Sequence, residues 1–364
     1  MKSALVSGCK NVSNKIGLTG KAAFLIAVFI LSGNLIASAT GITNQLSKLF
    51  YWPTDEGVVA GEYTVHMAIN TPSSPKWIFE PWIWEDTTNT QASTEALVDG
   101  YSSRNIPFGV IIIDSPWETK YNNFIVDTSR YPNMKGMIDD FHSQGKKVLF
   151  WITNYVNRSD TNGDEGVKST NYDEACQGSN GYSYFIESTP GNCATFEWRG
   201  NSSAIDYFNP DAVSWWHKEM DKAINLGIDG WKVDGTDYRA HLDPIQTRAG
   251  DKSNKEYNNA MYRDFRDYIK SKKSDAIIFS RAFAEHVDNT HGNNYFSPAD
   301  TCDACNFGDQ EVASFTDARG ITDYLYCLDK SVAGGYSAVG SDIGGYNFIA
   351  APGDKNLFIR WAQL

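Results

Sequence analysis

Five short apolar runs, each ending at a polar or charged residue, constrain the fold of this chain more than any other feature. Strands of a parallel sheet read as near-continuous apolar runs, because both of their faces are covered. The runs are residues 110–113, 148–152, 228–233, 276–279 and 336–340. Between them lie amphipathic stretches that predict helices over residues 94–104, 134–144, 212–225, 257–272 and 315–332. This alternation predicts an α/β fold with a parallel sheet.

The residues that end these runs favour one α/β architecture. Asp114, Asp234, Arg281 and Asp342 each stand at or just beyond the end of a run. In a (β/α)8 barrel all strand carboxyl ends meet on one catalytic face, whereas an open sheet gathers its chemistry at one switch point. A single Asp after a strand can be turn chemistry, but several together favour the barrel. We therefore predict a (β/α)8 TIM barrel over residues 76–364.

The N-terminal region has the charge order of a secretory signal or a membrane anchor. Residues 1–21 are basic, residues 22–39 form an apolar run, and no Asp or Glu precedes Asp55. An apolar run of about 18 residues is just long enough to span a bilayer. We expect either a signal-anchor or a cleaved signal peptide. Both place the barrel in the secretory pathway, as an anchored or a secreted protein, with residues 40–75 as a linker.

Composition excludes one class of partner and leaves others open. The net charge of -12 argues against nucleic acid, whose phosphates need a basic surface. Any membrane contact is expected only through the N-terminal segment, and the oligomeric state is not indicated. The 11 Trp and 19 Tyr residues suit sugar stacking and core packing equally well.

The cysteines fit an oxidising compartment. Cys176 and Cys193 bracket a Gly-, Ser- and Asn-rich stretch and are candidates for a disulfide. Cys302 and Cys305 can pair with each other or bind metal, but a zinc site needs further ligands at the right spacing, which the sequence lacks. No Gly-rich phosphate loop opens a helix. We therefore expect no metal or other cofactor.

Carboxylates dominate the predicted catalytic face, which points to acid–base or nucleophilic chemistry by Asp. Cleaving a glycosidic bond with retention needs one carboxylate at the anomeric carbon and one carboxylic acid at the leaving oxygen. The sequence offers more carboxylates than this reaction requires, so spacing alone does not identify the pair.

From Trp77 onward the chain resembles the catalytic barrel of glycoside hydrolase family 31. Several separated motifs agree in their order along the chain. They are Ile113-Asp114-Ser115-Pro116-Trp117, Ile205-Asp206-Tyr207-Phe208-Asn209-Pro210, Gly227-Ile228-Asp229-Gly230-Trp231-Lys232-Val233-Asp234, Ser280-Arg281, Ser341-Asp342-Ile343-Gly344-Gly345-Tyr346 and Phe358-Ile359-Arg360-Trp361-Ala362-Gln363. The segment from Phe296 to Gln310 is closer to a branch that includes α-galactosidase-like members.

The resemblance implies a catalytic pair. Asp234 matches the nucleophile that forms the covalent glycosyl-enzyme, and Asp309, which follows Gly308, matches the acid/base. The family usually carries a Trp shortly before this Gly-Asp pair, and this chain does not. Asp300 and Asp303 therefore stay open as alternatives for the acid.

The resemblance also implies a sugar-binding set. Asp114, Arg281 and Asp342 would bind hydroxyls of the cleaved sugar, Lys232 would do the same, and Trp151 would form a wall of the pocket. Two alternatives stay open. Lys232 can instead form a buried ion pair with a neighbouring Asp, and Trp151 can be core packing.

The chain departs from the family pattern in two places. Only the linker precedes the barrel, where members carry a β-sandwich domain, and the sequence stops at Leu364 in the helix after the seventh strand. We therefore expect a barrel without its eighth strand. The resemblance implies hydrolysis of terminal α-linked sugars by retention, with an α-glucosidase or α-galactosidase type of activity. A related transglycosidase or lyase and an inactive sugar-binding protein are the alternatives, and Asp206 is expected to order a loop.

Overall fold

The fold of this protein is seen in a computed structural model. The structure describes residues 75–85, 89–159, 168–189, 192–194, 196–197, 200–234, 244–280, 305–308, 338–341, 343 and 355–363. The predicted N-terminal apolar segment, residues 22–39, lies outside them. In the described part of the chain, no helix is long and apolar enough to cross a membrane.

Seven parallel strands form the main sheet of the described residues. They are β1 (Trp82–Glu85), β2 (Val110–Ile113), β3 (Lys147–Ile152), β9 (Gly230–Val233), β12 (Ile277–Ser280), β13 (Cys305–Gly308) and β14 (Ala338–Ser341). They pair in the order in which they follow one another along the chain. This sequential parallel order is that of a TIM barrel. In the described residues, β1 pairs only with β2 and β14 only with β13.

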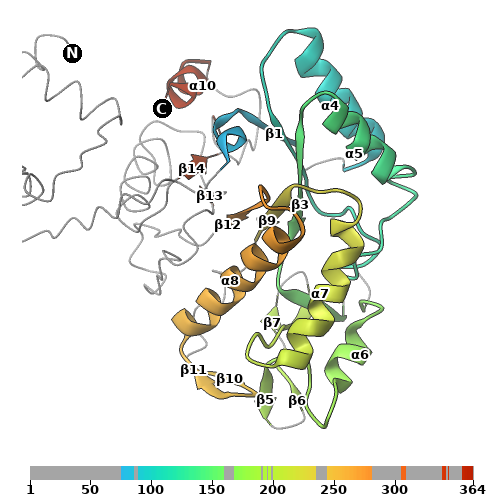
Figure 1. Ribbon diagram of the computed structural model, residues 1–364, viewed down its shortest axis with the longest axis vertical. Coiled ribbons are helices and arrows are strands. Elements are labelled where there is room, and N and C mark those ends of the chain that lie inside the picture. The colour runs from blue at the N-terminus through green and yellow to red at the C-terminus, as the bar shows by residue number, and fades with distance from the viewer. Residues whose placement is uncertain are drawn as a thin grey trace, which may run out of the picture. The chain divides into compact units, whose positions relative to one another are not determined.

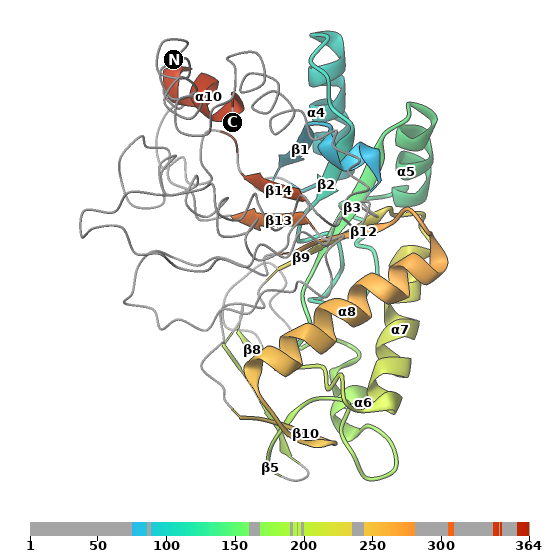
Figure 2. The same ribbon diagram turned by 60° about the vertical axis from the view of Figure 1, so that its left-hand side comes forward.

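Helices cover the outer side of this sheet (Figures 1 and 2). They are α4 (Gln91–Ser103), α5 (Met134–Ser143), α7 (Pro210–Ile224) and α8 (Asn254–Lys272). Near the C-terminus, α10 (Lys355–Ala362) follows β14 in the sequence. Four of the five predicted helices are confirmed to within three residues at each end, and the fifth, 315–332, lies outside the described residues. Capping side chains accept hydrogen bonds from the first turns of three of these helices. Thr90 and Ser253 form capping boxes at the starts of α4 and α8, and Asn209 caps α7.

The alternation of side chains along the strands separates two apolar layers. The inner layer contains Val110, Ile112, Leu149, Ile277 and Phe279, with Trp82 and Trp84 packed against it. The outer layer lies between the sheet and the helices and includes Ile111, Phe150 and Trp231. Successive residues of a strand therefore point alternately into the inner and the outer layer. This alternation determines which polar strand residues point toward the barrel axis.

Two strands of the sheet were missed by the apolar-run pattern. β1 has the sequence Trp-Ile-Trp-Glu and β13 has Cys-Asn-Phe-Gly. Polar or aromatic residues interrupt the aliphatic run in both strands. Their assignment depends on pairing with neighbours: β1 bonds to β2 over four residues, and β13 lies between β12 and β14.

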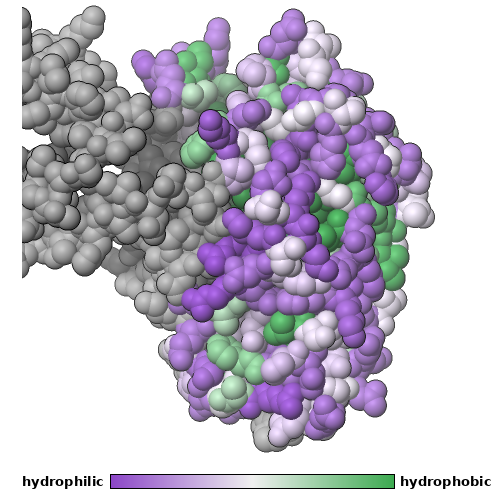
Figure 3. Space-filling view, in the orientation of Figure 1, coloured by the Kyte–Doolittle hydropathy of each residue, from purple (hydrophilic) through white to green (hydrophobic). Residues whose placement is uncertain are grey.

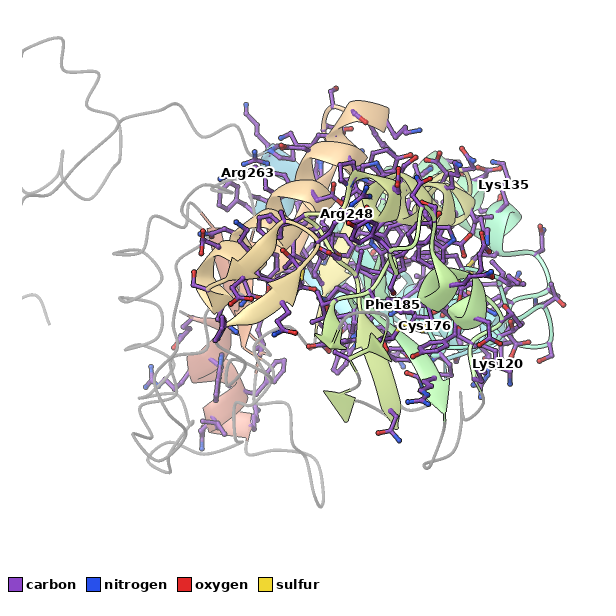
Figure 4. All side chains as sticks on the ribbon, turned by 90° about the horizontal axis from the view of Figure 1, so that it is seen from below. Lys120, Lys135, Cys176, Phe185, Arg248 and Arg263 are labelled. Atoms are coloured by element: carbon purple, nitrogen blue, oxygen red, sulfur yellow. A yellow bond between two sulfur atoms is a disulfide. The ribbon has the colours of Figure 1, made fainter. Side chains whose placement is uncertain are left out.

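A small subdomain is inserted between β3 and α7. It contains β4 (Tyr155–Ser159), α6 (Tyr172–Gln177), β5 (Glu187–Thr189), β6 (Asn192–Cys193), β7 (Phe196–Glu197) and β8 (Asn201–Ala204), and the hairpin of β10 (Ile245–Thr247) and β11 (Gly250–Lys252) contacts it through β5. The Cys176–Cys193 disulfide joins α6 to β6 and confirms the predicted pair (Figure 4). Cys302 lies outside the described residues, so the CxxC prediction stays untested.

The surface of the described part is polar on the face shown in Figure 3, where hydrophobic residues form only small separate groups. The large apolar side chains that are exposed, such as Phe79, Ile106 and Ile125, come from distant elements. The 3-10 helix η1 (Lys76–Phe79) carries the first of them.

Candidate active site

Four predicted site residues lie together at the carboxyl ends of β2, β3 and β9. Trp151 on β3 pairs in register with Lys232 on β9, and Asp114 directly follows β2. Asp234 directly follows β9, and its backbone N–H donates to the Ile152 carbonyl at 2.9 Å, which extends the pairing of β9 with β3. All four side chains are buried. The structure therefore brings together these four residues from three separate segments of the sequence.

Asp114 and Lys232 form a buried ion pair. Lys232 Nζ lies 2.9 Å from Asp114 Oδ2, and both residues are less than 10% exposed. This confirms the ion-pair alternative for Lys232. A buried pair of this kind needs further hydrogen bonds to offset its desolvation. Asp114 Oδ1 accepts one from the Ser115 backbone N–H at 2.8 Å.

Trp84 completes this pair and was not among the predicted site residues. Its indole Nε1 donates to Asp114 Oδ2 at 2.6 Å, and its ring lies 4.6 Å from Lys232 Nζ. The ring face stabilises the ammonium group by a cation–π interaction. The alternation of Trp82 and Trp84 on one strand is the sequence signal that places both on the inner side, but β1 was not recognised as a strand.

The carboxylate of Asp234 is held by Trp151. Trp151 Nε1 donates to Asp234 Oδ2 at 2.8 Å, and the Trp151 carbonyl accepts from Trp117 Nε1 at 2.9 Å. Trp151 is 2% exposed and its ring packs against Tyr121, as the core-packing alternative predicts, and its role as a pocket wall stays a prediction. The same residue also makes a polar contact with the predicted nucleophile, which the sequence did not indicate.

Gly230, the first residue of β9, lies where the neighbouring strands approach β9 closely. A Cβ atom at this position would lie 2.4 Å from the Ile277 carbonyl oxygen and 3.2 Å from Leu149 Cγ. Neighbouring strands therefore approach β9 too closely for any side chain there. This close approach explains the Gly in the Gly230-Trp231-Lys232-Val233-Asp234 motif.

The remaining predicted site residues, Asp309, Arg281 and Asp342, lie outside the described residues. Each one directly follows the last residue of a strand in the sequence: Gly308 ends β13, Ser280 ends β12 and Ser341 ends β14. The competing acids Asp300 and Asp303 lie outside the described residues as well.

Asp206 orders a loop, as predicted. Its Oδ1 accepts from the Phe208 backbone N–H at 2.9 Å, and its Oδ2 accepts from the Arg248 backbone N–H at 2.7 Å. These bonds tie the start of α7 to the turn of the β10–β11 hairpin. Arg248 (labelled in Figure 4) adds a 2.7 Å bond to Asn209.

A second charged cluster lies at the amino-terminal end of β9. Asp229 is fully buried, and its carboxylate contacts Lys147, Lys273, His142 Nε2 and the Val148 backbone N–H. Burial alone raises the pKa of this carboxyl group, but the hydrogen bonds, led by that from Lys273, hold the pKa below its usual value. The amino-terminal ends of TIM-barrel strands lie on the side opposite the catalytic face, where residues serve stability. We assign this cluster to stability.

No group of three His, Cys, Asp or Glu residues that can hold a metal occurs in the described part of the chain. Within the described residues, the polar groups of the candidate site are the carboxylates of Asp114 and Asp234, the indole N–H groups of Trp84 and Trp151, and the ammonium group of Lys232. Residues 71–296, more than half of the chain, match the sequence model of the glycosyl hydrolases family 31 TIM-barrel domain. The chain belongs to glycoside hydrolase family 31.

Relatives in family 31 differ in the activities for which they are named. The chain is 26% identical over 271 residues to an isomaltosyltransferase from Sporosarcina globispora, a match that covers 66% of this chain and 24% of that protein. It is 25% identical over 302 residues to an α-xylosidase from Emericella nidulans, covering 79% of this chain and 34% of that protein. The chain therefore spans about a quarter to a third of the length of these curated relatives. They do not confirm the α-galactosidase-like branch.

Solved family 31 structures share the fold. An α-xylosidase from a soil metagenome, complexed with xylose, superimposes with a TM-score of 0.62 at 18% identity, over 80% of this chain and 40% of that one. The cycloalternan-degrading enzyme from Trueperella pyogenes gives a TM-score of 0.65 at 19% identity, over 79% of this chain and 41% of that one. These similarities confirm the predicted TIM-barrel fold.

Proposed function

We propose that this protein hydrolyses terminal α-linked sugars with retention of configuration, and that Asp234 is the nucleophile. The observation that carries the proposal is the position of Asp234, which directly follows β9 with one carboxylate oxygen fixed by Trp151 Nε1. This hydrogen bond orients the carboxylate at the end of β9. Asp114, at the end of β2, and Lys232, on β9, form an ion pair that we expect to supply groups for binding sugar hydroxyls.

The proposed reaction has two displacements. The Asp234 carboxylate attacks the anomeric carbon while the carboxylic acid of Asp309 gives its proton to the leaving glycosidic oxygen. This forms an ester between Asp234 and the sugar and releases the aglycone alcohol. Asp309, now a carboxylate, takes a proton from water as that water attacks the anomeric carbon, which frees Asp234 and returns Asp309 to its acid form.

A mechanism-based fluorosugar tests the nucleophile. An α-configured 5-fluoroglycosyl fluoride forms a slowly hydrolysed ester with the attacking carboxylate, and peptide mass spectrometry locates that ester. We expect the label on Asp234 in the wild type and no label in Asp234→Ala. Asp114→Asn is the matched control, because it removes a neighbouring carboxylate and keeps the ester-forming residue. A label on any other residue rejects the assignment.

The acid/base assignment has a separate test. In Asp309→Ala, azide can attack the glycosyl-enzyme in place of water, because an anionic nucleophile needs no general base, so we expect added azide to raise the rate and produce a glycosyl azide. The same assay applied to Asp300→Ala and Asp303→Ala compares the alternatives. Azide rescue of either one, or wild-type rates in Asp309→Ala, removes Asp309 from this role.

A transglycosidase is the second candidate, favoured by the similarity to the isomaltosyltransferase of Sporosarcina globispora. Both activities use the same glycosyl-enzyme and differ only in the acceptor. Reaction in water labelled with oxygen-18 separates them, because a hydrolase places the label at C1 of the released sugar. The alternative of an inactive sugar-binding protein predicts binding without label uptake or release of sugar.

The sugar itself is proposed only as a class. Aryl α-glucosides, α-galactosides and α-xylosides differ by one hydroxyl configuration or one hydroxymethyl group. Comparing kcat/KM across the three, under the same conditions, decides among α-glucosidase, α-galactosidase and α-xylosidase activity. The relatives support α-glycoside cleavage without selecting among these sugars.

We also propose that the barrel, residues 76–364, works in the secretory pathway behind a basic region, 1–21, an apolar signal or anchor, 22–39, and a linker, 40–75. The charge order of the N-terminus and the Cys176–Cys193 pair support this location, because disulfides persist in oxidising compartments. Fractionation of cells that express the full chain tests it. Recovery in the cytosol would reject it, and carbonate extraction separates an anchored form from a secreted one.

A further inference from the structure

We infer that Trp84 is a specificity-determining positioning residue, which fixes Asp114 so that the carboxylate reads one hydroxyl of the terminal sugar. The inference rests on the proposed function and deepens it. Trp84 lies on β1, the strand next to β2, and its register partner Ile112 stands two residues before Asp114. Because residues two apart share a face of the sheet, Asp114 is the next residue on the inner face after Ile112, and its carboxylate lies beside the Trp84 indole.

The hydrogen bonds of Asp114 show what Trp84 does. A carboxylate can accept about four hydrogen bonds, two at each oxygen. Oδ2 accepts two in the described structure, from Trp84 Nε1 at 2.6 Å and Lys232 Nζ at 2.9 Å. Oδ1 accepts one, from the Ser115 backbone N–H. Among the described donors, this leaves one acceptor direction, on Oδ1, which suits a single sugar hydroxyl.

Trp84 also holds the cation of the pair. Lys232 Nζ lies 4.6 Å from the centre of the Trp84 ring, so one residue contacts both charged partners. A Lys side chain has four rotatable bonds, and the ring face restricts where its ammonium group can lie. Because the indole fixes both the carboxylate and the ammonium group, a loss of Trp84 frees Asp114 to turn and accept other hydroxyls.

Trp82 provides a matched control on the same strand. It lies on the same inner face two residues earlier, and its Nε1 donates to the Ile78 carbonyl at 3.1 Å. Its ring packs against Phe279 at 4.7 Å. Trp82→Phe and Trp84→Phe thus remove the same group from neighbouring positions of one strand, and only the second contacts Asp114.

The test measures discrimination among hydroxyls. The aryl α-glycoside that the wild-type full chain cleaves fastest is compared with its 2-, 3- and 4-deoxy analogues, with rates counted per active site by fluorosugar titration. We expect Trp84→Phe to reduce the kcat/KM preference for the parent over one of these analogues at least tenfold, while the other two ratios stay within twofold. Trp82→Phe is expected to keep all three ratios. In Asp114→Asn the same single ratio should fall, and adding Trp84→Phe should not lower it further.

Each outcome decides the inference. Unchanged ratios in Trp84→Phe, equal losses in all three, or an additive loss in the double variant would overturn it. If Trp84→Phe does not fold, Trp84→Tyr, which also lacks the indole N–H, takes its place. If the wild type cleaves no α-glycoside, the proposed hydrolysis fails, and calorimetric binding of the reducing sugar and its deoxy analogues then measures the same ratios as Kd values.

Discussion

The indole Nε1 of Trp151 donates to Asp234 Oδ2 at 2.8 Å, so a residue of β3 fixes the carboxylate that follows β9. The pairing of the two strands brings these side chains together: Trp151 is in register with Lys232, two residues before Asp234. The orientation of the Asp234 carboxylate therefore depends on the pairing of β3 with β9. A substitution of Trp151 can change this orientation without altering Asp234 itself.

Replacing Trp151 by Phe should lower kcat/KM for α-glycoside cleavage about 10- to 100-fold. A hydrogen bond to a charged group contributes about 1.5–3 kcal/mol, and each 1.4 kcal/mol corresponds to about a factor of ten. Steady-state kinetics on the best aryl glycoside measures this loss. Trp231→Phe is the control, because the buried Trp231 Nε1 has no hydrogen-bond partner in the described structure and its ring belongs to the outer layer. A loss of similar size in both variants would show that the effect is one of packing.

Asp114 and Lys232 should show strong energetic coupling. Removing one partner of a buried ion pair leaves an uncompensated charge and costs about 3–5 kcal/mol, whereas replacing both often costs little. We expect Lys232→Met to lower the free energy of unfolding by about 3 kcal/mol, and Asp114→Asn with Lys232→Met to lower it by less than the sum of the single changes. Urea unfolding of the four proteins gives the coupling energy. Additive losses would mean that the pair does not interact.

Asp229 should stabilise the barrel in a pH-dependent way. Its folded-state pKa is held below the usual value by the hydrogen bonds of its cluster, against the effect of burial. A carboxyl with a lowered folded pKa stabilises the fold above its unfolded pKa of about 3.9, and this contribution is lost as the pH falls toward the folded value. Asp229→Asn should therefore lower the free energy of unfolding by about 3 kcal/mol at pH 7, with a smaller difference below about pH 4.

The control for this cluster is Asp275→Asn. The Asp275 carboxylate contacts Lys147 at 3.0 Å but is 45% exposed, so its loss should cost less than about 1 kcal/mol. Chemical denaturation from pH 3 to pH 8 compares the two variants. A difference between wild type and Asp229→Asn that grows as the pH falls would contradict the predicted sign.

The Cys176–Cys193 disulfide should stabilise the inserted subdomain. The bridge closes a segment with a sequence separation of 17, and closing a loop of about 15 residues contributes about 3 kcal/mol in the chain-entropy account. Cys176→Ser with Cys193→Ser should lower the melting temperature, and reductant should lower it for the wild type alone. Limited proteolysis is expected to cut first in the inserted subdomain of the double variant. Reductant sensitivity in that variant would assign the effect to other thiols.

The sequence alone determined the α/β class, four of the described helices and five of the seven strands of the main sheet, because apolar runs and amphipathic stretches report burial directly. Polar residues at the strand ends indicated the catalytic face, and the family resemblance selected Asp234 among several carboxylates. The sequence analysis missed β1 and β13, because Trp and Glu in β1 and Asn and Gly in β13 interrupt the aliphatic run by which the other strands were recognised.

Only the tertiary structure decided which side chains touch. Strand register joined Trp84 to Asp114 and Trp151 to Asp234, pairs that are 30 and 83 residues apart in the sequence. It also joined Lys232 to Asp114, whose carboxylate lies 2.9 Å from the ammonium group although the two residues are 118 positions apart in the sequence. The reason is physical: periodicity along one strand reports which face a side chain occupies, whereas its neighbours depend on how other strands align beside it.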